Sequence, residues 1–588
     1  MDELLYGNMS LWGVAGAGAA LAALPRMVAR LRLSRAKHPS LAGHSRMAKR
    51  MARLVPAVHY DEQRFFAADD APEEVIAQRR AGLDRLAAEY DARFPQSAQM
   101  AAAIADSLPD ARFTGTYRVP FQFSQYLRTR LRVAPVMTAS SGFEMQDADG
   151  NTFIDLTGSY GVNVFGIDFY KAAIAEGARR ADALGPVLGA YHPALAWNVR
   201  RLREISGLDA VSFHMSGTEA VMQAVRLARY HTGRSHIVRF CGAYHGWWDD
   251  VQPGVGNPMP PRETYTLRDM DPRSLGILRS RKDIACVLVN PLQALHPNAN
   301  PPGDSALLGG RACGRYDRAA YADWLAQLRL VCSERGIALI FDEVFLGFRL
   351  AQGGAQEYFG VRADMVTYGK TLGGGLPVGV VCGRADLMKR FRDDAPADVC
   401  LARGTFNAHP YVMTAMQVFL ERLGEPAIAA TYVDADARWN ARCEAFNAAM
   451  RAADLPIAAW NLQSVWAVAI DVPSRYNWML QFYLRAEGLA LSWVGTGRLI
   501  FPLNFDDDSF AETIRRFVRA GHRMQVDGWW WHAAEASTRG IGRTVMKELL
   551  VRRVFFMCGA ARQAACSCCS PWCGSYSSPC SRRIGARQ

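Results

Sequence analysis

Short apolar runs alternate with longer amphipathic stretches through the middle of the chain, and this pattern restricts the fold more than any other feature. The runs occupy residues 211–215, 237–240, 286–290, 338–341, 365–368 and 378–382. Stretches with helical periodicity, such as 318–334, lie between them. Strands that alternate with helices predict an α/β domain built on a mostly parallel sheet.

Length and charge restrict the rest of the molecule. A chain of 588 residues is too long for one compact core, so we expect a catalytic unit of two or more lobes with additional segments at both ends. The net charge of +12 comes from the ends, because residues 1–60 and 523–588 each carry +7 whereas residues 61–522 carry −2. A near-neutral body argues against a nucleic-acid groove, which needs clustered basic side chains.

The first 56 residues form a hydrophobic and basic segment. Residues 4–25 contain no charged side chain, and Arg26, Arg30, Arg32, Arg35 and Lys37 follow them. This pattern predicts a membrane anchor or an interfacial helix, with the rest of the chain on the cytoplasmic side. An ordinary packed hydrophobic helix is the alternative. Residues 57–114, with helical periodicity over 73–90, are interpreted as a helical linker or accessory segment.

The last segment, 526–588, is basic and rich in cysteine. Its cysteines are Cys558, Cys566, Cys568, Cys569, Cys573 and Cys580. A zinc site is one interpretation, but residues 558–588, which hold these cysteines, contain no histidine and lack hydrophobic periodicity, which favours an unstructured tail. The remaining cysteines are scattered singly, as buried small residues are, and no metal site is expected in the body.

Ser216, Gly217, Thr218 and Glu219 follow the run at 211–215 directly and precede a helical stretch that ends at Gly233. Ser216 and Glu219 have the spacing of a capping box. A helix that begins at a glycine presents free backbone N–H groups and the positive end of its dipole. The pattern therefore predicts a phosphate-binding helix N-terminus.

Two further residues follow strand-like runs. Asp342 and Glu343 end the run at 338–341, at the sheet edge where α/β proteins bind ligands. Lys370 follows the run at 365–368 and precedes the glycines at 373–375. An amine confined in a pocket loses its proton readily and can form a Schiff base.

These motifs together resemble class III aminotransferases. The resemblance rests on 216–220, Ala243-Tyr244-His245-Gly246, 341–347, 353–356, Asp364, 369–375 and Gly404-Thr405-Phe406. It covers roughly 115–525, and 342–388 is most similar to glutamate-1-semialdehyde aminomutases and to aminotransferase modules of polyketide and peptide synthetases. It implies a fold type I pyridoxal-phosphate-dependent transferase: a large α/β domain at about 166–390 and a smaller α+β domain from the flanking parts.

The resemblance also implies roles for individual residues. Lys370 would hold pyridoxal 5′-phosphate as an internal aldimine and move the substrate proton, and Asp342 would pair with the pyridine nitrogen. Ser216, Gly217 and Thr218 would bind the phosphate. The ring would lie between Tyr244 and Val344, with His245 and Gln293 nearby, although Asn290 replaces the usual glutamate before Gln293. Thr405 would reach the phosphate in the neighbouring subunit of a homodimer.

The implied reaction is amino transfer from an amino-acid donor to a carbonyl acceptor through pyridoxamine phosphate. Arg498 resembles the arginine that binds the substrate α-carboxylate, with a surface or inter-lobe ion pair as the alternative. A 2,1-aminomutase is the second interpretation, although residues 502–506 depart from the aminomutase pattern. A non-catalytic, membrane-tethered scaffold is a third. Trp247 and Trp248 would form an apolar wall for a lipid-like or carrier-bound acceptor.

Overall fold

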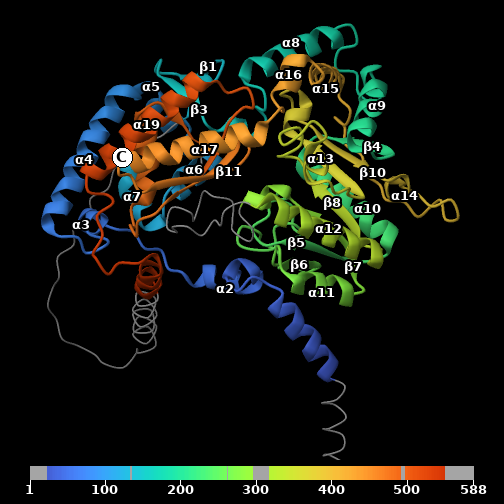
Figure 1. Cartoon of the computed structure of the whole chain (residues 1–588), viewed down its shortest axis with the longest axis horizontal. Helices are drawn as coiled ribbons and strands as arrows, with labels where there is room; N and C mark the ends of the chain where they lie inside the picture. Colours follow the sequence, from blue (N-terminus) through green and yellow to red (C-terminus); the bar gives the residue numbers. More distant parts are fainter. Residues whose placement is uncertain (1–22, 133–134, 261, 296–316, 492–496, 550–588) are drawn as a thin grey trace, which may run out of the picture.

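The computed structural model describes residues 23–132, 135–260, 262–295, 317–491 and 497–549. Figure 1 shows two lobes side by side, one around the long sheet and one around smaller sheets and long helices. Each lobe has its own core of buried apolar side chains.

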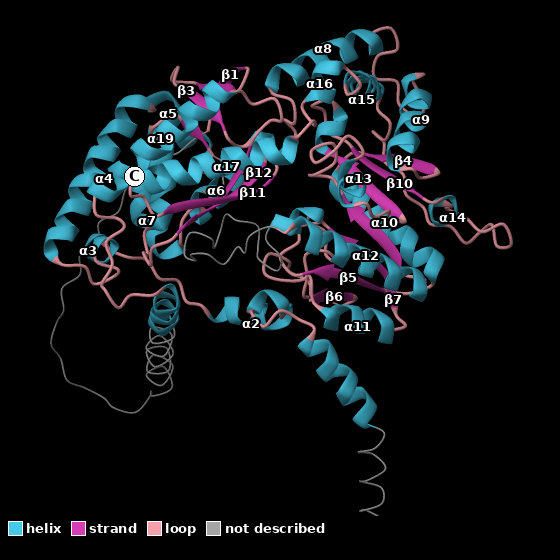
Figure 2. Ribbon diagram, in the orientation of Figure 1, coloured by secondary structure: helices cyan, strands magenta, loops and turns pink. Residues whose placement is uncertain are grey.

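A seven-stranded sheet forms the centre of the large lobe, in the order β4-β10-β9-β8-β7-β5-β6 (Figure 2). Its strands are β4 (Ala210–His214), β5 (His236–Phe240), β6 (Thr264–Leu267), β7 (Ile284–Val289), β8 (Ala338–Asp342), β9 (Met365–Gly369) and β10 (Gly379–Gly383). The predicted α/β fold is confirmed. The pairs among β5 to β9 are parallel, whereas β10 runs antiparallel to both β4 and β9. Sequence patterning missed β6, in which threonines break the apolar run.

Helices cover both faces of this sheet. The helices of the large lobe are α8 (Ile167–Ala181), α9 (Ala194–Ser206), α10 (Gly217–Thr232), α11 (Pro272–Ser280), α12 (Arg318–Arg335), α13 (Gly354–Phe359), α14 (Ala385–Met388), α15 (Pro410–Arg422) and α16 (Pro426–Ala430). Successive strand residues point to opposite faces. Leu339 and Phe341 of β8 therefore join one buried cluster, while Ile340 joins the cluster beneath α10.

The small lobe combines two sheets with long helices. One sheet has the order β1-β2-β3-β13 and the other β11-β12-β14. The strands are β1 (Met137–Ser141), β2 (Glu144–Asp147), β3 (Thr152–Asp155), β11 (Ile457–Leu462), β12 (Val465–Ile470), β13 (Leu489–Ala490) and β14 (Arg498–Ile500). The helices are α17 (Ala435–Ala452), α18 (Leu480–Ala486) and α19 (Asp507–Val526).

The helices between residues 62 and 130 are part of the small lobe. They are α3 (Glu62–Phe66), α4 (Glu73–Arg93), α5 (Pro95–Ile104), α6 (Pro109–Tyr117) and α7 (Phe121–Arg130). Phe65 lies 6.3 Å, ring centre to ring centre, from Trp478 and 6.4 Å from Trp529. Burial of such aromatic surface stabilises the lobe, so these helices complete its core rather than link two bodies.

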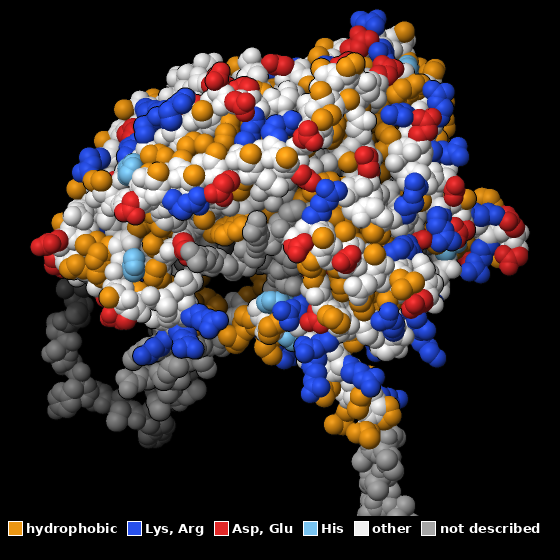
Figure 3. Space-filling view, viewed as in Figure 1, with side chains coloured by type: hydrophobic (Ala, Val, Ile, Leu, Met, Phe, Trp, Pro, Cys, Tyr) orange, Lys and Arg blue, Asp and Glu red, His pale blue; other side chains and the backbone are white. Residues whose placement is uncertain are grey.

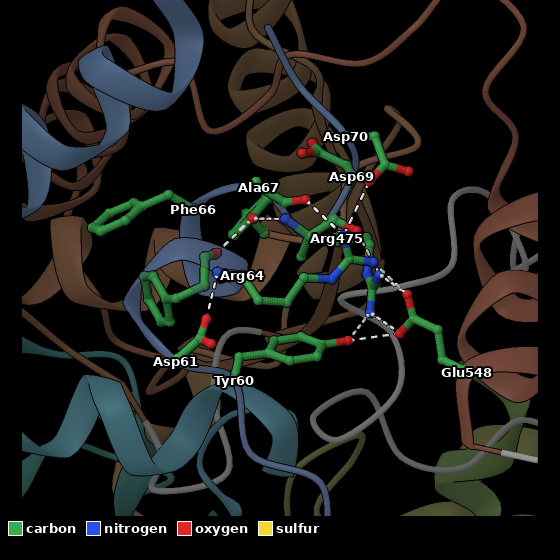
Figure 4. Close-up of polar contacts among 12 residues, drawn as sticks. Tyr60, Asp61, Arg64, Phe66, Ala67, Asp69, Asp70, Arg475 and Glu548 are labelled. Atoms are coloured by element: carbon green, nitrogen blue, oxygen red, sulfur yellow. Dashed lines mark hydrogen bonds and ion pairs between the residues drawn. The ribbon is translucent and has the colours of Figure 1, made fainter. Parts of the chain in front are cut away.

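A polar cluster ties three distant parts of this lobe together (Figure 4). Arg475 donates to the hydroxyl of Tyr60 at 2.6 Å and to Oε1 of Glu548 at 3.3 Å. Arg64 donates to the same Glu548 oxygen at 2.6 Å. Glu548 belongs to the helical residues 538–549, so this cluster holds them against α3.

The ends of the chain are only partly described. The predicted anchor at 4–25 lies outside the described residues except for its last three positions, and the cysteines of the tail lie outside them entirely. Within the described ranges, no helix is both long enough and apolar enough to cross a bilayer. Residues 23–35 are helical and lead through η1 (Leu41–Gly43) to α2 (Ser45–Leu54).

Candidate active site

A cleft of about 360 Å³ opens where β4, β8 and β9 end. Ser216 follows β4, Asp342 is the last residue of β8 and Lys370 follows β9, so all three come to the same edge of the sheet. Because β10 is antiparallel, it presents its beginning there, and Leu376, Pro377 and Val378 line the same cleft. The site residues predicted on three separate strands therefore meet in one place.

The N-terminus of α10 forms one wall. The Ser216 hydroxyl accepts a hydrogen bond from the backbone N–H of Glu219 at 3.3 Å, and Oε2 of Glu219 accepts one from the N–H of Met215 at 3.0 Å. In a standard capping box Glu219 would accept from the N–H of the N-cap residue, Ser216. Here it accepts from Met215, one residue earlier. The backbone N–H groups at the start of the helix remain available for an anion.

Glycines keep this wall close to the rest of the site. A Cβ on Gly217 would lie 2.5 Å from Cγ1 of Val344, and a Cβ on Gly246 would lie 2.6 Å from the Thr218 hydroxyl. Neither position has room for a side chain. Gly246 also has a φ of +92°, which glycine adopts without strain. The helix start is thus open to a ligand that approaches its backbone.

Asp342 is buried and held by its neighbours. Its Oδ2 lies 2.8 Å from Nδ1 of His245, and its Oδ1 accepts from the N–H of Val344 at 3.2 Å and from the Thr367 hydroxyl at 3.3 Å. Burial lowers the pKa of His245, and Asp342 acts against that shift. Nε2 of His245 is buried without a hydrogen-bond partner in the described part of the chain. The carboxylate is therefore fixed in orientation before any ligand binds.

Lys370 lies in a left-handed backbone conformation, with a φ of +45°. Side chains other than glycine rarely adopt it, and such conformations concentrate at functional sites. Burial lowers the pKa of Lys370, the Asp342 carboxylate raises it, and the Arg498 guanidinium lowers it. The amine thus loses its proton more readily than an exposed lysine does.

Phe345 is a cleft residue that sequence reasoning missed. Its ring centre is 5.6 Å from Nζ of Lys370 and 5.7 Å from Cζ of Arg498, so it lies against both side chains. Arg498 begins β14 of the small lobe, and burial lowers its pKa to about 10. Its place in the sequence could have indicated it, because Phe345 comes three residues after Asp342, the last residue of β8.

Other predicted residues divide into two groups. Tyr244, with 56% of its surface exposed, and Val344 both line the cleft. Gln293 does not; it is buried in η3 (Pro291–Leu295) and donates to the carbonyl of Cys241 at 2.7 Å. The neighbouring Asn290 lines the cleft instead and donates to the carbonyl of Tyr244 at 3.0 Å.

Three predicted residues lie away from the cleft wall. Thr405 is exposed in a turn. Trp247 is 72% exposed, and Trp248 packs against the core beneath α10. Neither tryptophan lines this chain's own cleft, so the apolar wall predicted from them is not formed here.

The donor set fits one kind of ligand. A helix N-terminus suits a phosphate, a fixed carboxylate suits a protonated ring nitrogen, and a desolvated amine suits an aldehyde. Pyridoxal 5′-phosphate carries all three groups. Because Gly217 and Gly246 have no side chains, its phosphate can approach the backbone at the helix N-terminus. Within the described residues, no cluster of histidine, cysteine or carboxylate side chains could hold a metal ion.

Comparison with known proteins agrees with this geometry. The sequence profile of the family described as Aminotransferase class-III matches residues 128–250 and 316–520. A glutamate-1-semialdehyde 2,1-aminomutase of Citrifermentans bemidjiense is 33% identical over 361 residues, which cover 58% of this chain and 77% of that protein. A protein of the same name from Methanocaldococcus jannaschii is 36% identical over 298 residues, 47% of this chain and 64% of that protein.

Solved structures have the same fold. A β-phenylalanine aminotransferase from Variovorax paradoxus is 25% identical, with a TM-score of 0.59 over 76% of this chain and 98% of that one. A transaminase with bound pyridoxal phosphate is also 25% identical, with a TM-score of 0.58 over 74% and 99%. The chain belongs to the class III aminotransferase family, with a fold type I architecture and pyridoxal 5′-phosphate as its cofactor.

Proposed function

We propose that this enzyme transfers an amino group from an amino-acid donor to a carbonyl acceptor, with Lys370 as the catalytic base. The observation that carries the proposal is the meeting of Lys370, Asp342 and the α10 N-terminus in one cleft, with Arg498 of the small lobe beside it. An amine, a fixed carboxylate, an anion site and a second cation are together what amino transfer requires.

The cofactor-binding roles follow from the placement of each group. Ser216, Gly217 and Thr218 would bind the phosphate, Asp342 would accept from the pyridine nitrogen, and Tyr244 and Val344 would flank the ring. When bound, pyridoxal phosphate supplies an electron sink for the bond that breaks at the substrate carbon. The His245 contact keeps Asp342 directed at one point, so the ring nitrogen meets a preoriented charge.

Lys370 is suited to carry the substrate proton. Its lowered pKa favours the neutral amine, which can accept a proton at Nζ and then return it. The Phe345 ring excludes water on one side of this amine. Since proton transfer by a base in a confined site depends on its protonation state, the desolvation that lowers the pKa is part of the function.

Arg498 would bind the donor carboxylate. It belongs to the small lobe and, like Lys370, lies against the Phe345 ring, so a substrate whose carboxylate binds Arg498 would have its α-carbon near the lysine. A guanidinium binds a carboxylate through two parallel hydrogen bonds and so fixes its orientation.

Thr405 would act in the neighbouring subunit of a homodimer. It is exposed and lies outside the cleft of its own chain, which suits a residue that completes the phosphate site of a partner subunit. Phe406 and Leu401, close to it in sequence, are 49% and 68% exposed. Cover by a second subunit would remove this apolar surface from water.

A 2,1-aminomutase is the second candidate, and the identity of 33–36% with proteins of that name supports it. The two reactions differ in whether the amino group stays with its own substrate. We would incubate the holoenzyme with an amino-acid donor and a separate carbonyl acceptor and follow both by mass spectrometry. Formation of a keto acid and a new amine in equal amounts supports transamination. Conversion of glutamate-1-semialdehyde without any donor, and no exchange with added donor, would identify an aminomutase.

A further inference from the structure

Helix α2 has two chemically distinct faces, and none of its residues is buried. At 100° per residue, Arg46, Lys49, Arg50 and Arg53 share one face. Met47, Met51 and Leu54 share another, where Met47 is 58% and Leu54 41% exposed. A basic face beside an exposed apolar face is typical of helices that lie in a membrane interface.

The helical residues 23–35 carry a second exposed apolar stripe. Leu24, Met27, Val28 and Leu31 have the spacing of one helical stripe, and each is between 39% and 63% exposed. Leu33 lies on the opposite side and packs against the large-lobe core. The stripe therefore faces away from the body, and Figure 3 shows apolar and basic side chains together on this projecting helix.

The charge of this surface has one sign. Residues 23–54 contain nine lysines and arginines and no acidic residue. Seven of these side chains, all arginines, are exposed: Arg26, Arg30, Arg32, Arg35, Arg46, Arg50 and Arg53. A net positive charge next to apolar side chains is complementary to a surface that carries negative charges above an apolar interior.

The segment is joined to the enzyme by specific contacts. The carbonyl of Ala36, a fully buried residue, accepts from the N–H of Arg268 at 2.8 Å. Nζ of Lys49 donates to the carbonyls of Asn257 and Met259. Docking through residues 23–54 would therefore fix the large lobe relative to whatever surface is bound.

We propose that residues 23–54 dock this enzyme on an anionic lipid bilayer, with the apolar faces in the interface and the arginines against lipid phosphates. A second copy of the chain that met this surface on a two-fold axis would place the positive surface against itself, which like-charge repulsion opposes. A nucleic acid would satisfy the arginines but leave the methionine and leucine side chains in water. The proposal does not depend on which carbonyl compound the enzyme uses.

The test is co-sedimentation of the full chain with vesicles. One set would contain equal parts phosphatidylglycerol and phosphatidylcholine, and the other phosphatidylcholine alone. We expect binding to the anionic set that weakens in high salt, because screening shortens the reach of the charges. The variant Arg46→Gln/Arg50→Gln/Arg53→Gln should bind roughly a hundredfold more weakly, at about fivefold per arginine. Met47→Gln/Leu54→Gln should bind the anionic vesicles roughly tenfold or more weakly, because it loses apolar contact with the lipid.

The matched control is Arg392→Gln/Arg451→Gln/Arg515→Gln, which removes the same charge from exposed arginines of the body. It should bind as the unaltered enzyme does. Equal binding to both vesicle sets, or binding that the α2 substitutions leave unchanged, would overturn the proposal. So would a change of oligomeric state in the α2 variants with vesicle binding intact, or preferential binding of duplex DNA over anionic vesicles.

Discussion

Nδ1 of His245 lies 2.8 Å from Oδ2 of Asp342, and both side chains are buried beside the cleft that contains Lys370. The contact fixes a carboxylate that would otherwise rotate about its own side chain. A carboxylate that is already oriented toward a protonated ligand atom does not have to reorient during the reaction, so no free energy is spent on that reorganisation. We therefore propose that His245 is a positioning residue for Asp342.

This relationship predicts a difference between two substitutions of one residue. His245→Asn keeps a nitrogen near the Nδ1 position, whereas His245→Gln places its amide near Nε2. We expect kcat to fall roughly ten- to a hundredfold in His245→Gln, as for other residues that orient a functional ligand, and less in His245→Asn. Steady-state kinetics of both would check this. Equal losses in the two variants would show that the ring is needed for packing alone.

Lys370 should carry the cofactor covalently. Borohydride reduction of the holoenzyme followed by peptide mapping should place the cofactor on Lys370, and Lys389, a partly exposed lysine on the same lobe, should remain unlabelled. Lys370→Ala should keep its circular dichroism spectrum and lose turnover, because the role of the amine is chemical. Label on a different lysine would contradict the assignment.

The pH dependence of cofactor attachment follows from the charges around this amine. The neutral amine reacts, so the rate at which apoenzyme takes up pyridoxal phosphate should rise with pH, with a midpoint below the ordinary lysine pKa of 10.5. Arg498→Gln removes a charge that lowers the pKa of Lys370, so the midpoint should move up. Asp342→Asn removes one that raises it, so the midpoint should move down. Stopped-flow absorbance would measure both, and shifts of the opposite sign would exclude this electrostatic account.

Arg498 should distinguish the two halves of the reaction. If its guanidinium binds the donor carboxylate, Arg498→Ala should weaken use of the amino-acid donor by roughly 1.5–3 kcal/mol, about ten- to a hundredfold. Reaction of the pyridoxamine form with an acceptor that lacks a carboxylate should change far less. Single-turnover measurements would separate the halves. Equal losses in both would assign Arg498 to the contact between the lobes.

Phe345 should limit the size of the acceptor. Its ring lines the cleft and lies against both Lys370 and Arg498, so Phe345→Ala should raise kcat/KM for bulky acceptors relative to small ones by roughly tenfold or more, the scale of a few methylene groups in a pocket. Phe391→Ala is the control, because Phe391 is 49% exposed and does not line the cleft. A uniform loss for all acceptors would mean that the ring only supports Lys370.

The strand and helix pattern, and the residues at strand ends, were determined by the sequence alone. The run at 338–341 became β8 and the run at 365–368 became β9, each within one residue, because continuous apolar character is a local property. The position of Asp342 and Lys370 at the same edge followed from parallel pairing. Ser216 capped α10 as predicted, since a cap depends on residues three apart.

Tertiary structure decided what depends on distant residues. Phe345 reached Arg498 of β14 because the small lobe folds back across the cleft, which no local pattern reports. Gln293 turned to the carbonyl of Cys241 and left Asn290 in the cleft wall. The segment 57–114, predicted as a helical linker or accessory segment, packs into the small-lobe core, because Phe65 meets Trp478 and Trp529 from more than four hundred residues away. Periodicity shows which face of a helix is apolar, but only the assembled chain decides what covers it.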